Sequence, residues 1–319
     1  MKRSLEANVL LSLTVLALAG CGGSGGSSGT NFIPPPPVTP TPTPTPSSTP
    51  TSPMLAPFGL KSSQQFATFG VLNRSDAGKY NVATADPNAI KFSWSAEANA
   101  YEVTLPGFAP ARLALTFPGN NPVAFHATDA SGNRLPLALS VWRSSDAPLN
   151  LSYSSLAFYA TDPGGATDPF ISASFAFGVS TAPGSVPVTG TASYDASIFG
   201  RTTSNNGYDI IGDARLTFDF SAGSLSGYMR PRLFSDWDAV DRTLGQYDFN
   251  QTVYSTGSTT FSGKFVVPNA PNAQSDTAFQ GQFTGPNAAE LIAGWRAPYL
   301  DPLDNAWKSM GGVWVGKKQ

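Results

Sequence analysis

The single histidine of the chain, His126, is the first candidate for general acid–base chemistry. It follows Phe125 and lies close to Asp129, but a Ser-His-Asp triad also needs a nucleophile on the other side of the imidazole. No Gly-x-Ser-x-Gly nucleophile turn accompanies it in the strand-rich part of the sequence. We therefore interpret His126 as a structural or solvated residue, in a loop or at the end of a strand.

The best candidate for a metal site is the acidic group Asp236, Asp238 and Asp241, because hard cations bind several oxygen ligands on one short loop. The group lacks the glycine turn and the distal glutamate of a calcium loop, and Arg242 competes for its negative charge. We expect a solvated loop at this place and no metal.

Glu290 is a candidate general base, yet no second carboxylate lies beside it in the sequence. Its position in a predicted turn favours the capping of backbone N–H groups. The strand-rich part of the chain also lacks zinc-type ligand spacing and phosphate-binding glycine motifs. We expect no catalytic residue and no cofactor. An enzyme is the alternative that convergent titratable groups in a deep cleft would favour.

The only cysteine, Cys21, ends the run Leu18-Ala19-Gly20-Cys21. Lys2 and Arg3 precede an apolar stretch from Val9 to Leu18, and this order, with small residues at the cut, is typical of an export signal. The segment resembles the signal of bacterial lipoproteins, in which the thiol takes a diacylglyceryl group and the new amino terminus is acylated. The resemblance predicts a mature chain that begins at Cys21 and is anchored by lipid. The alternative is a secreted protein with Cys21 at the cleavage site by chance.

The predicted location is the outer membrane, on the cell surface or on its periplasmic face. Gly22 follows the cysteine, where an aspartate favours retention at the inner membrane in known lipoproteins. The apolar stretch is far shorter than the ~18 to 20 residues that span a bilayer, so we expect no permanent transmembrane helix.

A tether follows, and its composition changes along its length. Gly22 to Gly29 is rich in glycine and serine and predicts a flexible coil. Pro34 to Pro53 is rich in proline and threonine, predicts polyproline II and would reach on the order of 60 Å at ~3.1 Å per residue. We interpret the segment as a spacer; a proline-rich ligand for a recognition domain is the alternative.

The composition of the remaining chain, from about Met54, predicts an all-β fold. The sequence contains 31 Gly, 21 Phe, 10 Tyr and 6 Trp, and its charged fraction of 13% is well below the ~25% of an average globular protein. A net charge of -2 without a basic cluster gives no electrostatic footprint for nucleic acid.

Alternating large apolar residues and intervening turns predict antiparallel strands in two regions. The second region, 186–319, carries eight candidates that could close into a barrel with a filled interior: 188–194, 208–220, 224–233, 245–254, 259–267, 278–284, 291–298 and 311–316. The first, 57–185, predicts a separate and more open sheet with strands at 89–95, 101–105, 135–142, 153–159 and 171–179. Only Ala288 to Ile292 and Asp236 to Arg242 are expected to be helical. The segments are therefore a signal peptide (1–20), a tether (21–56), the open sheet (57–185) and the barrel (186–319).

Several motifs resemble the β-barrel domain of transferrin-binding protein B and related surface lipoproteins. The main one runs from Phe279 to Leu291 as FQGQFTGPNAAEL, and the runs Gly190 to Tyr194, Asp219 to Gly227 and Met310 to Trp314 also resemble that domain. The resemblance implies that the first sheet corresponds to the handle sheet that precedes a barrel in that family. Ile292 and Ala293 replace the usual pair of glycines, and the chain has length for one handle and barrel where the namesake has two. The resemblance therefore implies a surface-anchored binding protein, without carrying over transferrin as its ligand.

Aromatic residues supply the candidate ligand contacts. The set includes Tyr228, Tyr247, Tyr254, Trp295, Tyr299 and Trp314, and most of it is expected in the core. Those in predicted loops, Phe234, Trp237 and Trp307, are candidates for an exposed binding rim. We predict a non-catalytic binding protein that captures a protein or a small nutrient; a structural or envelope-interaction lipoprotein without a soluble ligand is the alternative.

Overall fold

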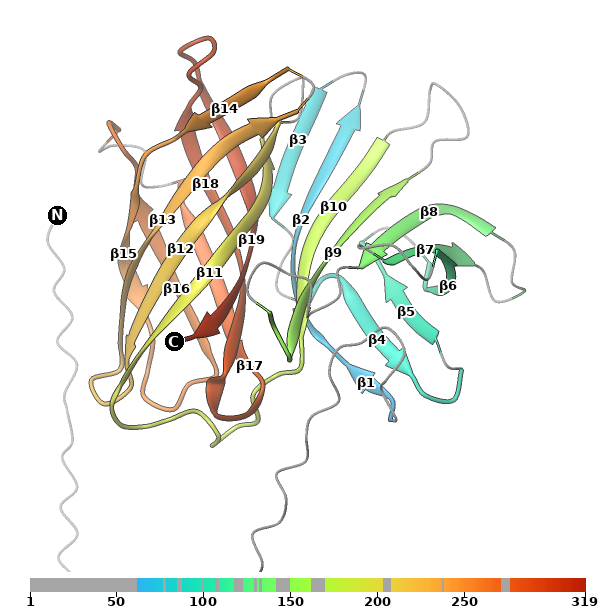
Figure 1. Ribbon diagram of the computed structural model, residues 1–319, viewed down its shortest axis with the longest axis horizontal. Coiled ribbons are helices and arrows are strands. Elements are labelled where there is room, and N and C mark those ends of the chain that lie inside the picture. The colour runs from blue at the N-terminus through green and yellow to red at the C-terminus, as the bar shows by residue number, and fades with distance from the viewer. Residues whose placement is uncertain are drawn as a thin grey trace, which may run out of the picture. The chain divides into compact units, whose positions relative to one another are not determined.

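The computed structural model describes residues 62–319 except 77–78, 85–87, 99, 107–108, 118–122, 129–130, 132–133, 142–149, 162–169, 203–207, 237 and 271–275. The predicted signal, Cys21 and the tether lie outside the described residues, and so do Asp129 and Trp237. The described chain is all-β, with two antiparallel sheets in sequence order (Figure 1).

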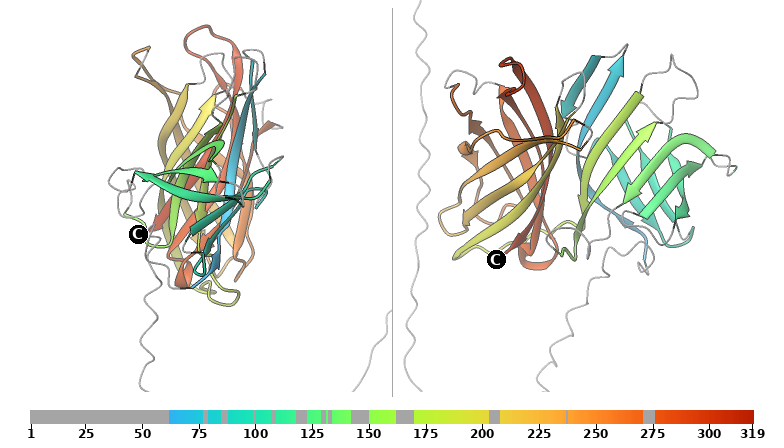
Figure 2. Two further views of the ribbon diagram at one scale, coloured as in Figure 1. Left: turned by 90° about the vertical axis from the view of Figure 1, so that its right-hand side faces the viewer. Right: turned by 45° about the horizontal axis from the view of Figure 1, so that its top comes forward.

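The second sheet closes into an eight-stranded antiparallel barrel. Its strands are β11 (Thr191–Thr202), β12 (Asp209–Asp219), β13 (Ser224–Ser235), β15 (Tyr247–Val253), β16 (Thr260–Val266), β17 (Ala278–Thr284), β18 (Glu290–Leu300) and β19 (Trp307–Lys318). Sequential pairing is completed by two further pairings, β11 with β19 and β13 with β15, so no edge of the ring is left open. Figure 2 shows the tilt with which these strands wrap. The predicted fold class is confirmed, and each of the eight predicted barrel strands overlaps an observed one. The first, predicted at 188–194, shares only residues 191–194 with β11.

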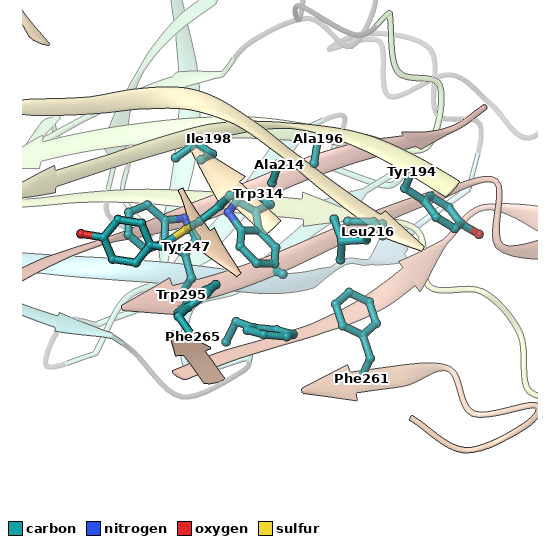
Figure 3. Packing of buried hydrophobic residues seen from close by; sticks show 14 of the residues in the cluster. Tyr194, Ala196, Ile198, Ala214, Leu216, Tyr247, Phe261, Phe265, Trp295 and Trp314 are labelled. Carbon is teal, nitrogen blue, oxygen red and sulfur yellow. The ribbon is translucent and has the colours of Figure 1, made fainter. Parts of the chain in front are cut away.

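Inward-facing side chains fill the barrel interior. In β11 every second residue from Ala192 to Thr202 is buried, as expected for a strand with one face toward the interior. Figure 3 shows how Leu216, Phe261 and Trp314 gather inside with neighbouring rings. The Phe218 and Phe283 ring centroids lie 4.8 Å apart in an edge-to-face contact. The interior is thus a packed aromatic core, and the largest interior side chains have almost no contact with solvent.

Two glycines take backbone conformations in β12 and β13 that other residues rarely adopt. Gly212 and Gly227 have φ values of 149° and 155°, a region in which a side chain is strained. A Cβ atom at Gly227 would also collide with the carbonyl oxygen of Arg215 on the neighbouring strand. These positions therefore require glycine for a backbone reason.

The first sheet has ten strands, in the order β1-β4-β5-β6-β7-β8-β9-β10-β2-β3. Their bounds are β1 (Gln64–Gln65), β2 (Ala67–Asp76), β3 (Lys79–Thr84), β4 (Lys91–Ser95), β5 (Ala100–Thr104), β6 (Ala111–Phe117), β7 (Val123–Thr128), β8 (Arg134–Val141), β9 (Ser154–Thr161) and β10 (Phe170–Gly178). The five strands predicted here are present as β4, β5, β8, β9 and β10. The other five were not predicted.

This sheet rolls up so that its distant strands meet around a second aromatic core. β1 and β2 follow one another with only Phe66 between them, yet β1 pairs with β4 and β2 pairs with β10. The ring of Phe92 on β4 consequently lies 4.7 Å from that of Phe177 on β10. The sheet is therefore less open than the sequence predicts, because Phe66 connects β1 at one edge of the sheet to β2 near the opposite edge.

Both helix predictions are wrong. Residues Glu290 to Ile292 begin strand β18, and only a short 3-10 turn, η3 (Pro286–Ala288), precedes it. In the segment from Asp236 to Arg242, turn residues lead into the short strand β14 (Val240–Thr243), which pairs with the end of β13. Pairing partners on the barrel outweigh the helical preference of these short runs. No helix among the described residues is long and apolar enough to cross a membrane.

Candidate binding surface at one end of the barrel

The three predicted rim aromatics do not all lie in loops. Trp307 is the first residue of β19 and Phe234 lies within β13, while Trp237 is outside the described residues. Both described aromatics belong to the barrel end where β13 joins β14 and β18 joins β19, which we call the β14 end (top of Figure 1). Their strands have β12 and β11 between them, so the two rings occupy different sides of that end.

The β18–β19 hairpin gathers exposed apolar side chains at the β14 end. Leu300 lies directly opposite Trp307 in the strand register, and Leu303 follows in the turn. Their exposed fractions are 40%, 48% and 47%, respectively. Of the large hydrophobic side chains exposed in the described part of the chain, these three share one hairpin, whereas Val188 and Val253 lie at the opposite end of the barrel. Clustered exposed apolar groups are typical of an interaction site.

Asp301 gives this hairpin turn its shape. Its side chain is fully buried, and Oδ1 accepts a hydrogen bond of 2.9 Å from the backbone N–H of Leu303. The backbone N–H of Asp301 donates to Ala306 O at 2.9 Å, and Asn305 N–H donates back to Asp301 O at 2.8 Å. The exposed apolar residues therefore lie in and beside a turn that hydrogen bonds hold on both sides.

A lysine neutralises the buried carboxylate. Lys308 Nζ lies 2.6 Å from Asp301 Oδ2 and 2.7 Å from Asp304 Oδ2. Burial opposes the charged form of Lys308, but hydrogen bonds to the two carboxylates outweigh this effect and raise its pKa. The hydrogen bond from Lys308 in turn lowers the pKa of Asp304. Ion pairs and hydrogen bonds therefore fix the turn that carries the exposed Leu303.

At the other side of the β14 end, Phe234 lies half-buried on the outer face of β13. Strand alternation places Leu233 in the core and Phe234 outside, opposite Asp209 of β12 and Asp241 of β14. Asp241 forms an ion pair with Arg232, and the hydrogen bond from this guanidinium lowers the pKa of Asp241.

The three acidic residues considered as a metal site, Asp236, Asp238 and Asp241, have different positions and partners. Asp241 lies in a strand and pairs with Arg232, whereas Asp236 and Asp238 lie exposed in the preceding turn. Within the described ranges, no group of three or more His, Cys, Asp or Glu residues is placed to hold a metal ion.

Glu290 has a structural role between the two sheets. It is the first residue of β18 and is 2% exposed. Its carboxylate accepts hydrogen bonds from the backbone N–H groups of Ser152 at 2.6 Å and Tyr153 at 2.9 Å, next to β9 of the first sheet. Burial raises its pKa, against the opposing effect of these hydrogen bonds and of Lys317. The prediction that Glu290 caps backbone N–H groups is confirmed, although the groups belong to a distant segment.

Other polar contacts reinforce the same junction. Ser154 Oγ and Thr284 Oγ1 lie 2.6 Å apart, and the hydroxyl of Thr181 donates to Gly285 O at 2.7 Å. The motif from Phe279 to Leu291 therefore contributes both a barrel hairpin and the contacts that hold the first sheet against the barrel.

His126 lies within β7, opposite Ala114 on one side and Ala138 on the other. It is half-buried in the middle of a paired strand, not in a loop or at a strand end as we expected. Its neighbours in register are alanines, and its near neighbour in sequence, Asp129, is outside the described residues.

Comparison with solved structures finds similar chains at low sequence identity and with TM-scores below 0.5. No protein-family model and no curated protein matches the sequence. A double mutant of transferrin binding protein B from Haemophilus parasuis Hp5 is similar with a TM-score of 0.46 and 18% identity, over 79% of this chain and 45% of that chain. The isotype 1 protein from serogroup B Neisseria meningitidis gives 0.42 and 16%, over 79% and 44%. A structure described as a surface lipoprotein gives 0.37 and 12%, over 79% and 98%.

This chain therefore spans less than half of the length of the two transferrin binding protein B structures.

Sequence reasoning missed the neighbours of Trp307. Leu300 and Leu303 were not candidates, because single leucines near a turn carry no motif. The signal that could have found them is the run from Leu300 to Trp307, in which apolar residues flank Asp301, Asp304 and Asn305, the residues typical of a turn.

Proposed function

We propose that the protein is a lipid-anchored, non-catalytic binding protein of the outer membrane, displayed at the cell surface, that captures a protein or a small nutrient. In this proposal Cys21 carries the lipid, residues 21–56 are a spacer and the β14 end of the barrel contacts the ligand. The observation that carries it is the β18–β19 hairpin, where Leu300, Leu303 and Trp307 are exposed in and beside a turn fixed by Asp301.

The packed barrel interior favours a protein ligand over a small one. Trp314, Phe218 and Phe283 occupy the space in which a small molecule would otherwise lie. A ligand of the barrel would then bind to its outside, and exposed aromatic and leucine side chains near a rigid turn suit a protein surface.

The contacts of two buried carboxyl groups, those of Glu290 and Asp301, support a non-catalytic role. The Glu290 carboxylate is used by the backbone of Ser152 and Tyr153, and the Asp301 carboxylate by Leu303 and Lys308. Each is therefore part of the architecture.

The test is a capture experiment with the full-length protein immobilised and exposed to fluid from the native environment of the cells. Trp307→Ala and Leu303→Ser should each lose the ligand that the wild type retains. Val253→Ala is the matched control, because Val253 is 63% exposed at the opposite barrel end. Equal capture by all variants would contradict the assignment of the β14 end, and no specific capture by the wild type would favour the structural lipoprotein.

Protease treatment of intact cells tests the proposed location. Cleavage of the protein on intact cells is expected for surface display, and protection until the outer membrane is opened would assign it to the periplasmic face.

A further inference from the structure

A cavity of about 290 Å³ lies between the outer wall of the barrel and the first sheet. It is lined by β9 and β10 on one side and by β11 and β12 on the other. No residue of the β14-end hairpin contributes to it, so it is a separate place from the proposed ligand surface. Its volume is close to the lower limit of ligand pockets, roughly 300 to 1,000 Å³, and would hold one small molecule.

The walls of the cavity are mainly apolar. Phe158 of β9 faces it from the first sheet, and Phe199 and Ile211 face it from the barrel. These three side chains are only half-buried, and Phe199 packs at the margin of the cluster that includes Leu156. A small apolar group bound here would complete the burial of these three side chains, which is favourable because it removes apolar surface from water.

An ion pair at the same cavity supplies charge of both signs. Arg201 Nε donates to Asp209 Oδ1 at 2.9 Å, and both residues line the cavity. This bond uses one of the five N–H donors of the guanidinium and one oxygen of the carboxylate. The two side chains are 27% and 52% exposed, so their remaining groups are accessible. The Arg201 guanidinium also lies 5.5 Å from the centre of the Phe158 ring, which orients it over the apolar wall.

From this arrangement we propose that the cavity binds a free α-amino acid with an apolar side chain. The ligand carboxylate pairs with the terminal nitrogens of Arg201, its ammonium group pairs with Asp209, and its side chain enters the space between Phe158, Phe199 and Ile211. A carboxylate and a guanidinium side by side complement a zwitterion, whereas a simple anion would meet repulsion from Asp209 and a simple cation repulsion from Arg201.

The binding test is isothermal titration calorimetry with the full-length protein. L-phenylalanine and L-leucine are the probes, and L-serine tests the need for an apolar side chain. N-acetyl-L-phenylalanine and L-phenylalanine amide each lack one charge of the zwitterion. Each of these three should bind at least about tenfold more weakly than L-phenylalanine, the loss expected for one charge-assisted hydrogen bond or one buried apolar group.

Variants separate this site from general effects on the fold. Arg201→Met should weaken L-phenylalanine binding at least about tenfold, while Arg215→Met should not change it. Arg215 is the matched control because it pairs with Asp195 across the same two strands, outside the cavity. Asp209→Asn removes one charge with little change of shape, and should weaken L-phenylalanine binding without weakening that of the N-acetyl analogue.

Failure of wild-type binding at millimolar amino acid would overturn the proposal, and so would equal affinities of the Arg201 and Arg215 variants. Equal affinities for L-phenylalanine and its two blocked analogues would show that the cavity recognises only the apolar side chain. That result would also overturn the proposal. Capture of a partner through Trp307 is independent of every one of these results, so this inference and the proposed function can fail separately.

Discussion

Replacement of Glu290 by glutamine tests how the first sheet is held against the barrel. The wild-type carboxyl group offers two oxygens, one to Ser152 N–H and one to Tyr153 N–H. The glutamine amide has a single oxygen, and its NH₂ group cannot accept a hydrogen bond. The variant therefore leaves one backbone donor without an acceptor at a site where residue 290 is 2% exposed.

The expected cost is about 1 to 3 kcal/mol of unfolding free energy, the usual penalty for a buried donor left unsatisfied. The cost should depend on pH. Burial raises the pKa of Glu290 above its ordinary value of 4.5 in the folded state, so the folded protein binds the proton more tightly than the unfolded chain does. The stability that this tighter proton binding contributes to the wild type is fully present below pH 4.5 and is lost as the pH rises through the folded-state pKa of Glu290. The Glu290→Gln variant has no titrating group at this position. The difference in unfolding free energy between variant and wild type should therefore narrow as the pH rises.

The assay is urea unfolding of wild type and Glu290→Gln at several pH values, with hydrogen exchange of residues 150–153 as the local probe. Glu97→Gln is the control, because Glu97 is exposed in a turn of the first sheet. Faster exchange of the Ser152 and Tyr153 amides is expected only in the Glu290 variant. A change in unfolding free energy below ~0.3 kcal/mol, or a difference that widens with pH, would refute the reasoning.

Three further predictions address the core, the strand bends and the anchor. Trp314→Ala should lower the unfolding free energy by about 3 to 5 kcal/mol, because the side chain is 0% exposed, whereas Trp307→Ala should change it by less than ~1 kcal/mol. A melting temperature that falls further in Trp307→Ala than in Trp314→Ala would contradict a packed interior. Gly227→Ala should destabilise more than Gly190→Ala, because only the former meets a neighbouring backbone, and equal urea midpoints would contradict this. Cys21→Ser should abolish incorporation of labelled palmitate and release the protein from membranes, and continued labelling would place the lipid elsewhere.

The barrel strands were predictable because each carries its own signal. In β12 and β17 large apolar residues such as Leu216, Phe218 and Phe283 fall on every second position, and turns rich in glycine and serine separate the strands. Closure followed from the number of strands and from short connections. The strand β14 was missed because it has only four residues with one buried among them.

The rolled first sheet was not predictable for a different reason. Its shape depends on β1 pairing with β4 while β2 pairs with β10, and such long-range choices leave no periodic pattern in the sequence. The start of β18 shows the same limit. Glu290 to Ile292 follow a Pro-Asn-Ala turn and suggest a helix, but pairing with Thr284 and with β19 decides for a strand.

Of the candidate surface, the sequence indicated Trp307 but not its setting. An aromatic residue near a turn is visible, whereas its pairing with Leu300 and the support from buried Asp301 depend on the strand register. The cavity beside Arg201 is even less predictable from the sequence, because it forms only where β9 lies next to the barrel wall.

The most direct test of the binding role is photocrosslinking on intact cells with a benzoyl-phenylalanine at position 303, compared with the same group at position 253. Both native side chains are exposed, at 47% for Leu303 and 63% for Val253, and they belong to opposite ends of the barrel. We predict one specific adduct from position 303 and none from position 253. An adduct from position 253 alone, or identical adducts from both positions, would contradict the assignment of the β14 end as the ligand surface.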